Sequence, residues 1–388
     1  MKLVLLVGSG SSIGAGLPGI DKLTQEVLKT AHVSKSGGMF RFSLEPSADR
    51  VPLVPMDDGR IEEIREFLAA LKRTAEGYFA PRWPGRKANY EDLSYIARQI
   101  EDAIGYEYEN AALVPLIQQS TRTYERSARD LENLAQSAAD FIHEYVSWRL
   151  QEVAPDLGRL RPILDALADA SLERCDVFTL NHDTLLERAL TERGIAYADG
   201  FEEQFGTLRL WTDTYTTAPS RRLFKLHGSV DWFRYALELD GWQGQVVART
   251  DGDPWHPFGP NKEDLGTPAG GKAEMLVGTF NKILGYPAGT YADQHARLHE
   301  SLRGADAVLV VGYGFGDKAI NSRVVAWMEK PRQRRRMLLI DPAANPMPPT
   351  TRGAIEQKWD RWRAAGVLTL FPFPLHGVTW SEIREKLA

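Results

Sequence analysis

A series of short, continuous apolar runs constrains the fold of this chain more than any other feature of its sequence. The runs do not alternate with polar residues, so both faces of each run must be buried, as in the strands of a parallel sheet. Helical segments separate several of the runs, at 183–193, 293–303 and 321–329. This alternation predicts an α/β fold with a doubly wound parallel sheet. The predicted strands are 3–7, 177–180, 223–226, 275–278, 307–311, 337–340 and 368–371.

The middle of the chain has a different pattern. Between residues 60 and 170 apolar residues recur at helical spacing, and no convincing strand pattern is found. We therefore predict a core domain at 1–35 and 171–388 that is interrupted by a large helical insertion domain at 36–170. A later stretch, 235–272, is rich in Gly, Pro and Asp and lacks periodicity, so we interpret it as a long surface excursion.

Composition narrows the classes of function. The 388 residues are 43% hydrophobic and 26% charged, which is ordinary for a globular protein. A formal net charge of −5 gives no general attraction to nucleic acid or to an anionic membrane. The single cysteine, Cys175, excludes an internal disulfide and a zinc site built from several cysteines. No apolar run approaches the ~20 residues that span a bilayer, and the N-terminal apolar stretch is too short for a signal peptide. We expect a soluble, cytoplasmic protein.

A glycine-rich turn directly follows the first predicted strand, with the sequence Gly8-Ser-Gly-Ser-Ser-Ile-Gly-Ala-Gly-Leu-Pro18. Such a turn lets backbone N–H groups approach phosphate oxygens. It does not fit the dehydrogenase fingerprint, because Ile13 stands where the third glycine is needed. The alternative is a turn that only connects a strand to a helix.

Asn181 and His227 each lie just past a predicted strand, and the carboxyl ends of parallel strands meet at one edge of a sheet. A carboxamide can accept from one hydroxyl and donate to a water without adding charge. An imidazole can take a proton from a hydroxyl or a water near neutral pH. We expect both side chains to face a ribose held by the glycine turn. The simpler alternatives are a helix cap for Asn181 and a half-buried structural histidine for His227.

Five motifs in chain order resemble the sirtuin family. The glycine turn resembles the opening sirtuin motif Gly-Ala-Gly-x-Ser-x-x-x-Gly-Ile-Pro, and Thr179-Leu-Asn-His-Asp183 resembles Thr-Gln-Asn-x-Asp. His227-Gly228 is similar to the sirtuin His-Gly pair. Val311-Gly-Tyr-Gly-Phe315 stands in place of the Gly-Thr-Ser loop, and Leu339-Ile-Asp341 in place of the late strand end that touches the adenosine ribose.

The resemblance implies a Rossmann-like core that binds NAD and cleaves the bond between nicotinamide and ribose. It implies that Asn181 and His227 are catalytic and that Asp183 orients the Asn181 loop or a ribose hydroxyl. It also implies that NAD is the substrate. No metal is expected, because the chain has a single cysteine and shows no ligand set at suitable spacing. The residues expected to contact NAD are Gly8, Gly10, Ser11, Ser12, Gly16, Pro18, Asp183, Gly312, Gly314 and Asp341.

Two departures separate the chain from deacylase sirtuins. It lacks the two Cys-x-x-Cys pairs that hold zinc, and Pro18-Gly-Ile-Asp21 replaces Pro-x-Phe-Arg. Together with Lys225-Leu-His-Gly-Ser-Val-Asp-Trp232, these departures resemble the bacterial sirtuin-like NAD hydrolases of anti-phage defence. That likeness implies NAD depletion and abortive infection, a homo-oligomer and, by analogy, a HerA-type hexameric ATPase as partner. The alternatives are a zinc-less protein deacylase and a non-catalytic regulatory subunit that binds NAD or ADP-ribose.

Three other features receive simpler interpretations. The second His-Gly pair, at His376, follows the last expected nucleotide contact and is interpreted as structural. His182-Asp183 could belong to a metal site, but no further ligands stand at suitable spacing. The basic run 330–336 is interpreted as a solvated loop between a helix and a strand, because no aromatic residues interleave with it. Direct nucleic-acid binding is therefore not expected.

Overall fold

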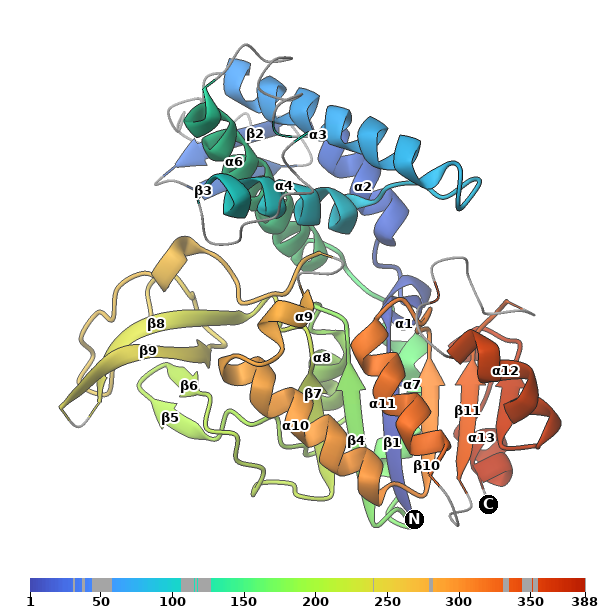
Figure 1. The fold of residues 1–388 in the computed structure, drawn as a ribbon. Helices are drawn as coiled ribbons and strands as arrows, with labels where there is room; N and C mark the ends of the chain where they lie inside the picture. Colours follow the sequence, from blue (N-terminus) through green and yellow to red (C-terminus); the bar gives the residue numbers. More distant parts are fainter. Residues whose placement is uncertain are drawn as a thin grey trace. The chain divides into compact units, whose positions relative to one another are not determined.

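The chain forms two compact units (Figure 1). One unit, here the sheet unit, consists of Met1–Gly19, Leu150–Leu276 and Ile283–Ala388. The other, the helical unit, consists of Ile20–Arg149 and Val277–Lys282. The computed structural model describes residues 1–30, 32–36, 39–43, 58–105, 115, 117, 127–239, 241–278, 282–330, 335–343, 351 and 355–387.

A six-stranded parallel sheet forms the centre of the sheet unit. Its strands are β1 (Lys2–Val7), β4 (Arg174–Thr179), β7 (Arg221–Lys225), β10 (Ala307–Val311), β11 (Arg336–Ile340) and β12 (Leu368–Phe371). The order across the sheet is β12-β11-β10-β1-β4-β7, and every neighbouring pair is parallel. Counted along the chain, this is the order 3-2-1-4-5-6 of a Rossmann-like doubly wound fold, which reverses between β1 and β10. The predicted fold class is confirmed.

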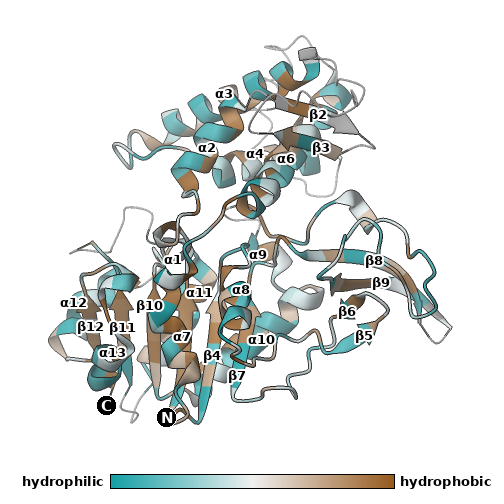
Figure 2. Cartoon of the chain, turned by 180° about the vertical axis from the view of Figure 1, so that it is seen from behind, coloured by the Kyte–Doolittle hydropathy of each residue, from teal (hydrophilic) through white to brown (hydrophobic). Residues whose placement is uncertain are grey.

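Helices cover both faces of this sheet, which explains the continuous apolar strands. Leu3, Leu5 and Val7 of β1 belong to one buried cluster, whereas Val4 and Leu6 belong to another. The first cluster includes apolar residues of α7 (Arg161–Ala168), α8 (Leu185–Glu192) and α13 (Trp380–Leu387). The second includes residues of α10 (Gly289–Gly304), α11 (Lys318–Met328) and α12 (Ile355–Ala364). Figure 2 shows these strands in hydrophobic colours.

A second sheet was not predicted from the sequence. The strands β5 (Glu203–Phe205), β6 (Leu208–Leu210), β8 (Trp232–Leu239) and β9 (Trp242–Arg249) form an antiparallel sheet in the order β5-β6-β9-β8. The interpretation of 235–272 as a surface excursion is therefore wrong for its first fifteen residues. The predicted strand at 275–278 is also wrong, because Met275 forms only an isolated bridge with Gly228.

The helical unit contains the predicted helices. They are α2 (Ile20–Lys29), α3 (Asp58–Phe79), α4 (Tyr90–Ile104) and α6 (Ala128–Gln151), and a hairpin of β2 (His32–Ser36) and β3 (Met39–Ser43) accompanies them. Glu26 of α2 accepts hydrogen bonds from Tyr145 and Arg149 of α6, and Arg98 of α4 pairs with Asp140 of α6. The main segment of this unit, Ile20–Arg149, begins and ends earlier in the chain than the expected insertion at 36–170, whose status as a domain stays a prediction.

Short elements complete the described chain. In the sheet unit these are α1 (Ser9–Gly14) and the 3₁₀ turns η2 (Leu157–Leu160), η3 (Ala269–Gly271) and η4 (Leu375–Gly377). The chain passes from the helical unit back to the sheet unit within α9 (Lys282–Gly285). α1 directly follows β1, so it places the glycine turn beside the reversal of strand order.

Candidate functional site

The predicted site residues follow strands that end at one edge of the parallel sheet. Val7 of β1 pairs with Thr179 of β4 and with Val311 of β10, so these strands end at the same level. β7 and β11 end in register with β4 and β10. In doubly wound folds, ligands bind beyond this edge, next to the reversal of strand order. The predicted residues placed here are Gly8, Asn181, His227, Gly312 and Asp341.

Asn181 joins the β4 loop to the β1 loop. Its Nδ2 donates to the Gly8 carbonyl at 3.1 Å, to Ser12 Oγ at 2.8 Å and to Ser11 Oγ at 3.3 Å. A carbonyl can only accept, so the amide nitrogen must face the β1 loop. Asn181 Oδ1 accepts no hydrogen bond from any described residue. This oxygen is therefore available to a substrate hydroxyl or a water.

The two serines predicted to contact NAD, Ser11 and Ser12, already use their hydroxyl protons within the chain. Ser11 Oγ donates to the Gly8 carbonyl at 2.8 Å, and Ser12 Oγ donates to Asp183 Oδ2 at 2.7 Å. Asp183 in turn accepts from the backbone N–H of Leu185 at 3.1 Å. The expected role of Asp183 in orienting the Asn181 loop fits this chain of bonds. A phosphate contact from either serine requires its hydroxyl to exchange partners.

Three of the predicted glycines allow the loops after β1 and β10 to touch. A Cβ on Gly8 would lie 2.6 Å from the Gly312 carbonyl oxygen, and a Cβ on Gly10 would lie 2.7 Å from Gly312 Cα. Gly312 has a φ of +59°, and its Cβ would lie 2.5 Å from the backbone nitrogen of Ser11. Gly10 N also donates to the Gly312 carbonyl at 2.9 Å. Close packing of the two loops therefore requires glycine at these three positions, whether or not phosphate binds.

The remaining predicted contacts are spread along the same loops. Gly16 has a φ of +103° and open space where a side chain would lie, and Pro18 is buried. Gly314 is exposed in the β10 loop. Asp341 follows β11 and accepts a hydrogen bond from the backbone N–H of Ala343 at 2.9 Å. Each of these positions is compatible with a ligand contact, and their roles stay a prediction.

His227 lies in a buried polar cluster with Tyr286 and Asp317. Its Nε2 lies 2.9 Å from the Tyr286 hydroxyl and 3.2 Å from Asp317 Oδ2. Tyr286 donates a short hydrogen bond to the same carboxylate oxygen. Because Tyr286 gives its only proton to Asp317, the protonated nitrogen of His227 is Nε2. Nδ1 is then the basic nitrogen of the neutral ring.

Asp317 is ionised in this cluster. Burial disfavours its charge, but hydrogen bonds from His227 and Tyr286 outweigh this and hold the pKa of the carboxyl well below its usual range. Its other oxygen accepts from the backbone N–H groups of Ala319 and Ile320 at 2.8 and 3.0 Å, which caps α11. The N-terminal N–H groups of α11 thus hold the Asp317 carboxylate in place, and the carboxylate in turn orients the His227 imidazole.

The loops that carry Asn181 and His227 are hydrogen-bonded neighbours. Val230 N donates to the His182 carbonyl at 2.9 Å, and the rings of His182 and His227 have centroids 6.2 Å apart. Lys225, at the end of β7, donates to the Asp183 carbonyl and forms a buried ion pair with Glu187 at 3.0 Å. Asn181 and His227 therefore lie on two loops that hydrogen bonds hold together.

The sequence did not lead us to predict three residues of this arrangement. Asp317 carried a usable signal, since an aspartate before a helical pattern is a common N-cap. Lys225 stood in a quoted motif without an assigned role, and a buried lysine is rare unless it is paired. Tyr286 follows the misinterpreted stretch and carries no signal that distinguishes it from a core tyrosine.

The structure bears on some of the simpler interpretations, namely those of His376, of a metal site and of the basic run 330–336. His376 contacts Arg159 Nη1 at 2.8 Å in an exposed position of η4. Among the described residues, no cluster of three or more His, Cys, Asp or Glu side chains could hold a metal ion. No helix in the described ranges is long and apolar enough to cross a membrane. Residues 331–334 of the basic run lie outside the described residues.

Comparison with protein families identifies one segment. Residues 176–367 match the SIR2-like domain family. The match supports a sirtuin-like family for this chain. The SIR2-like segment begins in β4 and ends just before β12, so it includes Asn181, His227 and Asp317. The glycine turn at Gly8 lies outside it, and its likeness to sirtuins rests on the motif alone.

Other comparisons add distant similarities. No curated protein matches this chain. Among solved structures, a Sir2 homolog–NAD complex is 13% identical with a TM-score of 0.37, covering 100% of this chain and 90% of that one. A Sir2 bound to acetylated peptide is 10% identical with a TM-score of 0.37, covering 99% of this chain and 92% of that one.

Proposed function

We propose that this chain is an NAD hydrolase that splits NAD and water into nicotinamide and ADP-ribose. The bond between nicotinamide and ribose C1′ breaks, a bond from C1′ to the water oxygen forms, and one proton is released. The observation that carries the proposal is the His227–Tyr286–Asp317 cluster, whose histidine loop is hydrogen-bonded to the loop of Asn181 at the edge of the sheet where the ligand site is expected. The SIR2-like match of residues 176–367 supports NAD as the substrate class.

The residues have separate roles in this proposal. His227 Nδ1 takes the proton of a ribose hydroxyl or of the attacking water, and Asp317 stabilises the imidazolium that forms. Asn181 Oδ1 holds the hydroxyl or the water, while its Nδ2 keeps the β1 loop in place. The glycine turn and Pro18 border the phosphates, and Gly312, Gly314 and Asp341 border the adenosine half.

Water is the acceptor in this proposal, although an acyl-lysine is the alternative. A chain with one cysteine, itself buried in β4, cannot build the cysteine zinc module of deacylases. We further propose a cytoplasmic role in anti-phage defence by NAD depletion, in a homo-oligomer with a HerA-type ATPase as partner. These assignments rest on resemblance to the defence proteins.

The first prediction concerns turnover. Purified protein should release nicotinamide and ADP-ribose from NAD without any acylated peptide, and His227→Ala should lower the rate by about 10²–10⁴-fold, since it removes the general base. His376→Ala is the matched control, because that exposed histidine lies at η4 and should leave the rate unchanged.

The assay separates the alternatives. Release that requires an acylated peptide would identify a deacylase. Thermal stabilisation by NAD or ADP-ribose without turnover would identify a regulatory subunit. Because a partner or a trigger can hold such an enzyme inactive, the same comparison is made in cells under phage challenge. Cellular NAD that falls equally with the wild type and His227→Ala would refute the proposal.

A further inference from the structure

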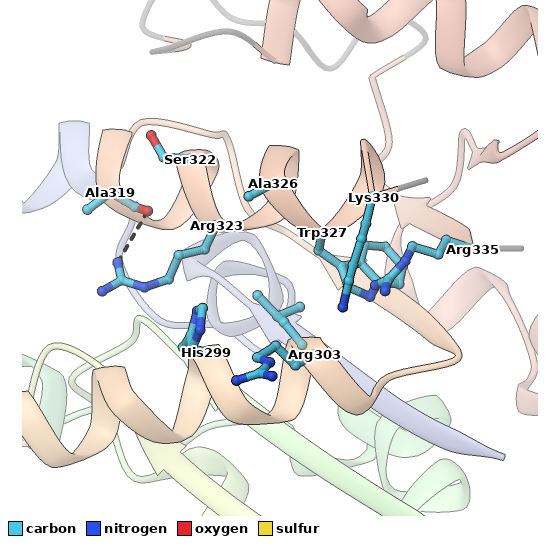
Figure 3. Close-up of a pocket in the computed structure, with 10 residues that line it drawn as sticks. His299, Arg303, Ala319, Ser322, Arg323, Ala326, Trp327, Lys330 and Arg335 are labelled. Atoms are coloured by element: carbon cyan, nitrogen blue, oxygen red, sulfur yellow. Dashed lines mark hydrogen bonds between the residues drawn. The ribbon is translucent and has the colours of Figure 1, made fainter. Parts of the chain in front are cut away.

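A cavity of about 550 Å³ lies within the sheet unit between α10 and α11 (Figure 3). These helices cover the face of the parallel sheet opposite to the face that α7 and α8 cover. α10 contributes His299, Leu302 and Arg303 to its lining, and α11 contributes Arg323 and Trp327 among others. Lys330 and Arg335 flank the connection from α11 to β11. None of these residues belongs to the candidate NAD site.

The charge of the cavity has one sign. Arg303, Arg323, Lys330 and Arg335 line it together with His299, and no acidic side chain is among its described lining residues. Arg303, Lys330 and Arg335 form no ion pair with a described residue, whereas Arg323 interacts with the charge of Asp317 and donates to the Ala319 carbonyl at 3.3 Å. By contrast, Arg297, which lies on α10 like Arg303, pairs with Asp213 at 2.7 Å. In a chain with a net charge of −5, three cations around one cavity that have no ion-pair partner among the described residues indicate a site for an anion.

Arg335 gives the strongest evidence, because its guanidinium is buried on the face of an aromatic ring and no described carboxylate pairs with it. Its side chain is 4% exposed, and Nε and Nη1 have no hydrogen-bond partner in the described structure. Its guanidinium lies 4.9 Å from the centre of the Trp327 ring. An arginine in such a position is costly unless it pairs with an anion. Burial also lowers the pKa of Arg335, as expected for a cation that lacks its partner.

The rest of the lining indicates how large the anion is. Leu302, Ala319, Ala326 and Trp327 form apolar walls between the cations. The volume lies in the range of pockets that hold ligands of drug size, and it exceeds what a lone phosphate fills. Figure 3 shows Arg323 folded back along α11, where its Nη1 donates to the Ala319 carbonyl at 3.3 Å, and Lys330 just beyond the end of α11 on the side of the cavity.

We propose that this cavity binds a phosphate-bearing ligand of nucleotide size, with the phosphate on Arg335, Lys330 and Arg303 and the remainder against the apolar walls. The site is separate from NAD cleavage and does not depend on the proposed function. It shares α11 with that site, because α11 begins at the Asp317 cap and carries Arg323 one and a half turns later.

Titration calorimetry on the full chain tests this site, with AMP, adenosine and inorganic phosphate as separate ligands. AMP should bind saturably, and adenosine and phosphate should each bind at least about tenfold more weakly, since each lacks one part of the recognition. Arg335→Gln should weaken AMP binding by a similar factor. The double variant Arg303→Ala/Lys330→Ala should also weaken AMP binding. Both of its side chains are exposed, so the fold should be retained.

Two controls locate the binding. Arg161→Ala removes an exposed, ion-paired arginine of the same unit far along the chain and should leave AMP binding unchanged. His227→Ala should also leave it unchanged, whether or not NAD is cleaved. The inference is overturned if AMP does not bind, if the cavity variants bind it normally, if phosphate alone binds as tightly, or if an acidic peptide binds in its place.

Discussion

One carboxylate sets the state of the proposed catalytic histidine. Asp317 accepts from Tyr286 and from His227 Nε2, so it selects the tautomer in which Nδ1 is basic. The second prediction follows from this geometry. Asp317→Asn keeps a good helix cap but presents an amide to the imidazole, so kcat should fall by about 10²–10⁴-fold with a smaller change in KM. Steady-state kinetics of NAD cleavage measures both, and an unchanged kcat would show that Asp317 serves only the helix.

The same carboxylate predicts a pH dependence of stability. Hydrogen bonds outweigh burial and hold the pKa of Asp317 below its unfolded value of about 3.9. A depressed folded pKa stabilises the fold above the unfolded pKa, and this contribution is lost as pH falls below it. Urea unfolding of the wild type and Asp317→Asn should therefore differ most at neutral pH, and the difference should begin to shrink below about pH 4. A constant difference down to pH 3 would contradict the assignment.

At the scale of elements, the loops after β1 and β10 form one backbone contact. Gly8 and Gly312 were predicted as ligand contacts, and the structure adds a packing reason, since a side chain at either position meets backbone. Sequence alone could place both glycines at strand ends because the apolar runs fix those ends. It could not show that the loops touch, because that contact depends on β1 and β10 being neighbours.

The fourth prediction tests this contact. Gly312→Ala introduces a Cβ 2.5 Å from Ser11 N at a φ of +59°, so it should destabilise the protein by about 1–3 kcal/mol and displace the β1 loop. Gly14→Ala is the control, because nothing lies within 4 Å of its Cβ and alanine favours helix α1. Thermal unfolding compares the two variants, and equal melting temperatures would mean that the loops separate freely.

The β8–β9 hairpin shows why part of the fold was missed. Phe233, Tyr235 and Leu237 are buried, while the residues between them face outward or are partly buried, so a period of two is present in β8. This short period is hard to recognise in the sequence, because Gly- and Pro-rich residues follow β9 directly. The apolar run at 275–278 gave the opposite error. A strand needs a continuous ladder, and in the described structure this run forms a single isolated bridge, between Met275 and Gly228.

At the scale of the whole molecule, the two compact units have separate cores. Leu5 of β1 is buried between strands and helices of the sheet unit, and Leu68 of α3 is buried in the helical unit. Helical periodicity was enough to predict that residues 60–170 differ from the rest of the chain. It could not place α2 with them, because the bonds of Glu26 to α6 span more than a hundred residues.

Separate cores predict that the chain does not unfold in a single step, because large multi-unit chains usually unfold unit by unit. Calorimetry should resolve two transitions. Leu5→Ala and Leu68→Ala each remove a fully buried leucine side chain, so each should lower one transition by roughly 5–15 °C and leave the other in place. NAD should raise only the transition that Leu5→Ala lowers, since every proposed contact lies in the sheet unit. If both substitutions lower one shared transition, the units fold as a single cooperative body, and the insertion must then contribute to the stability of the NAD site.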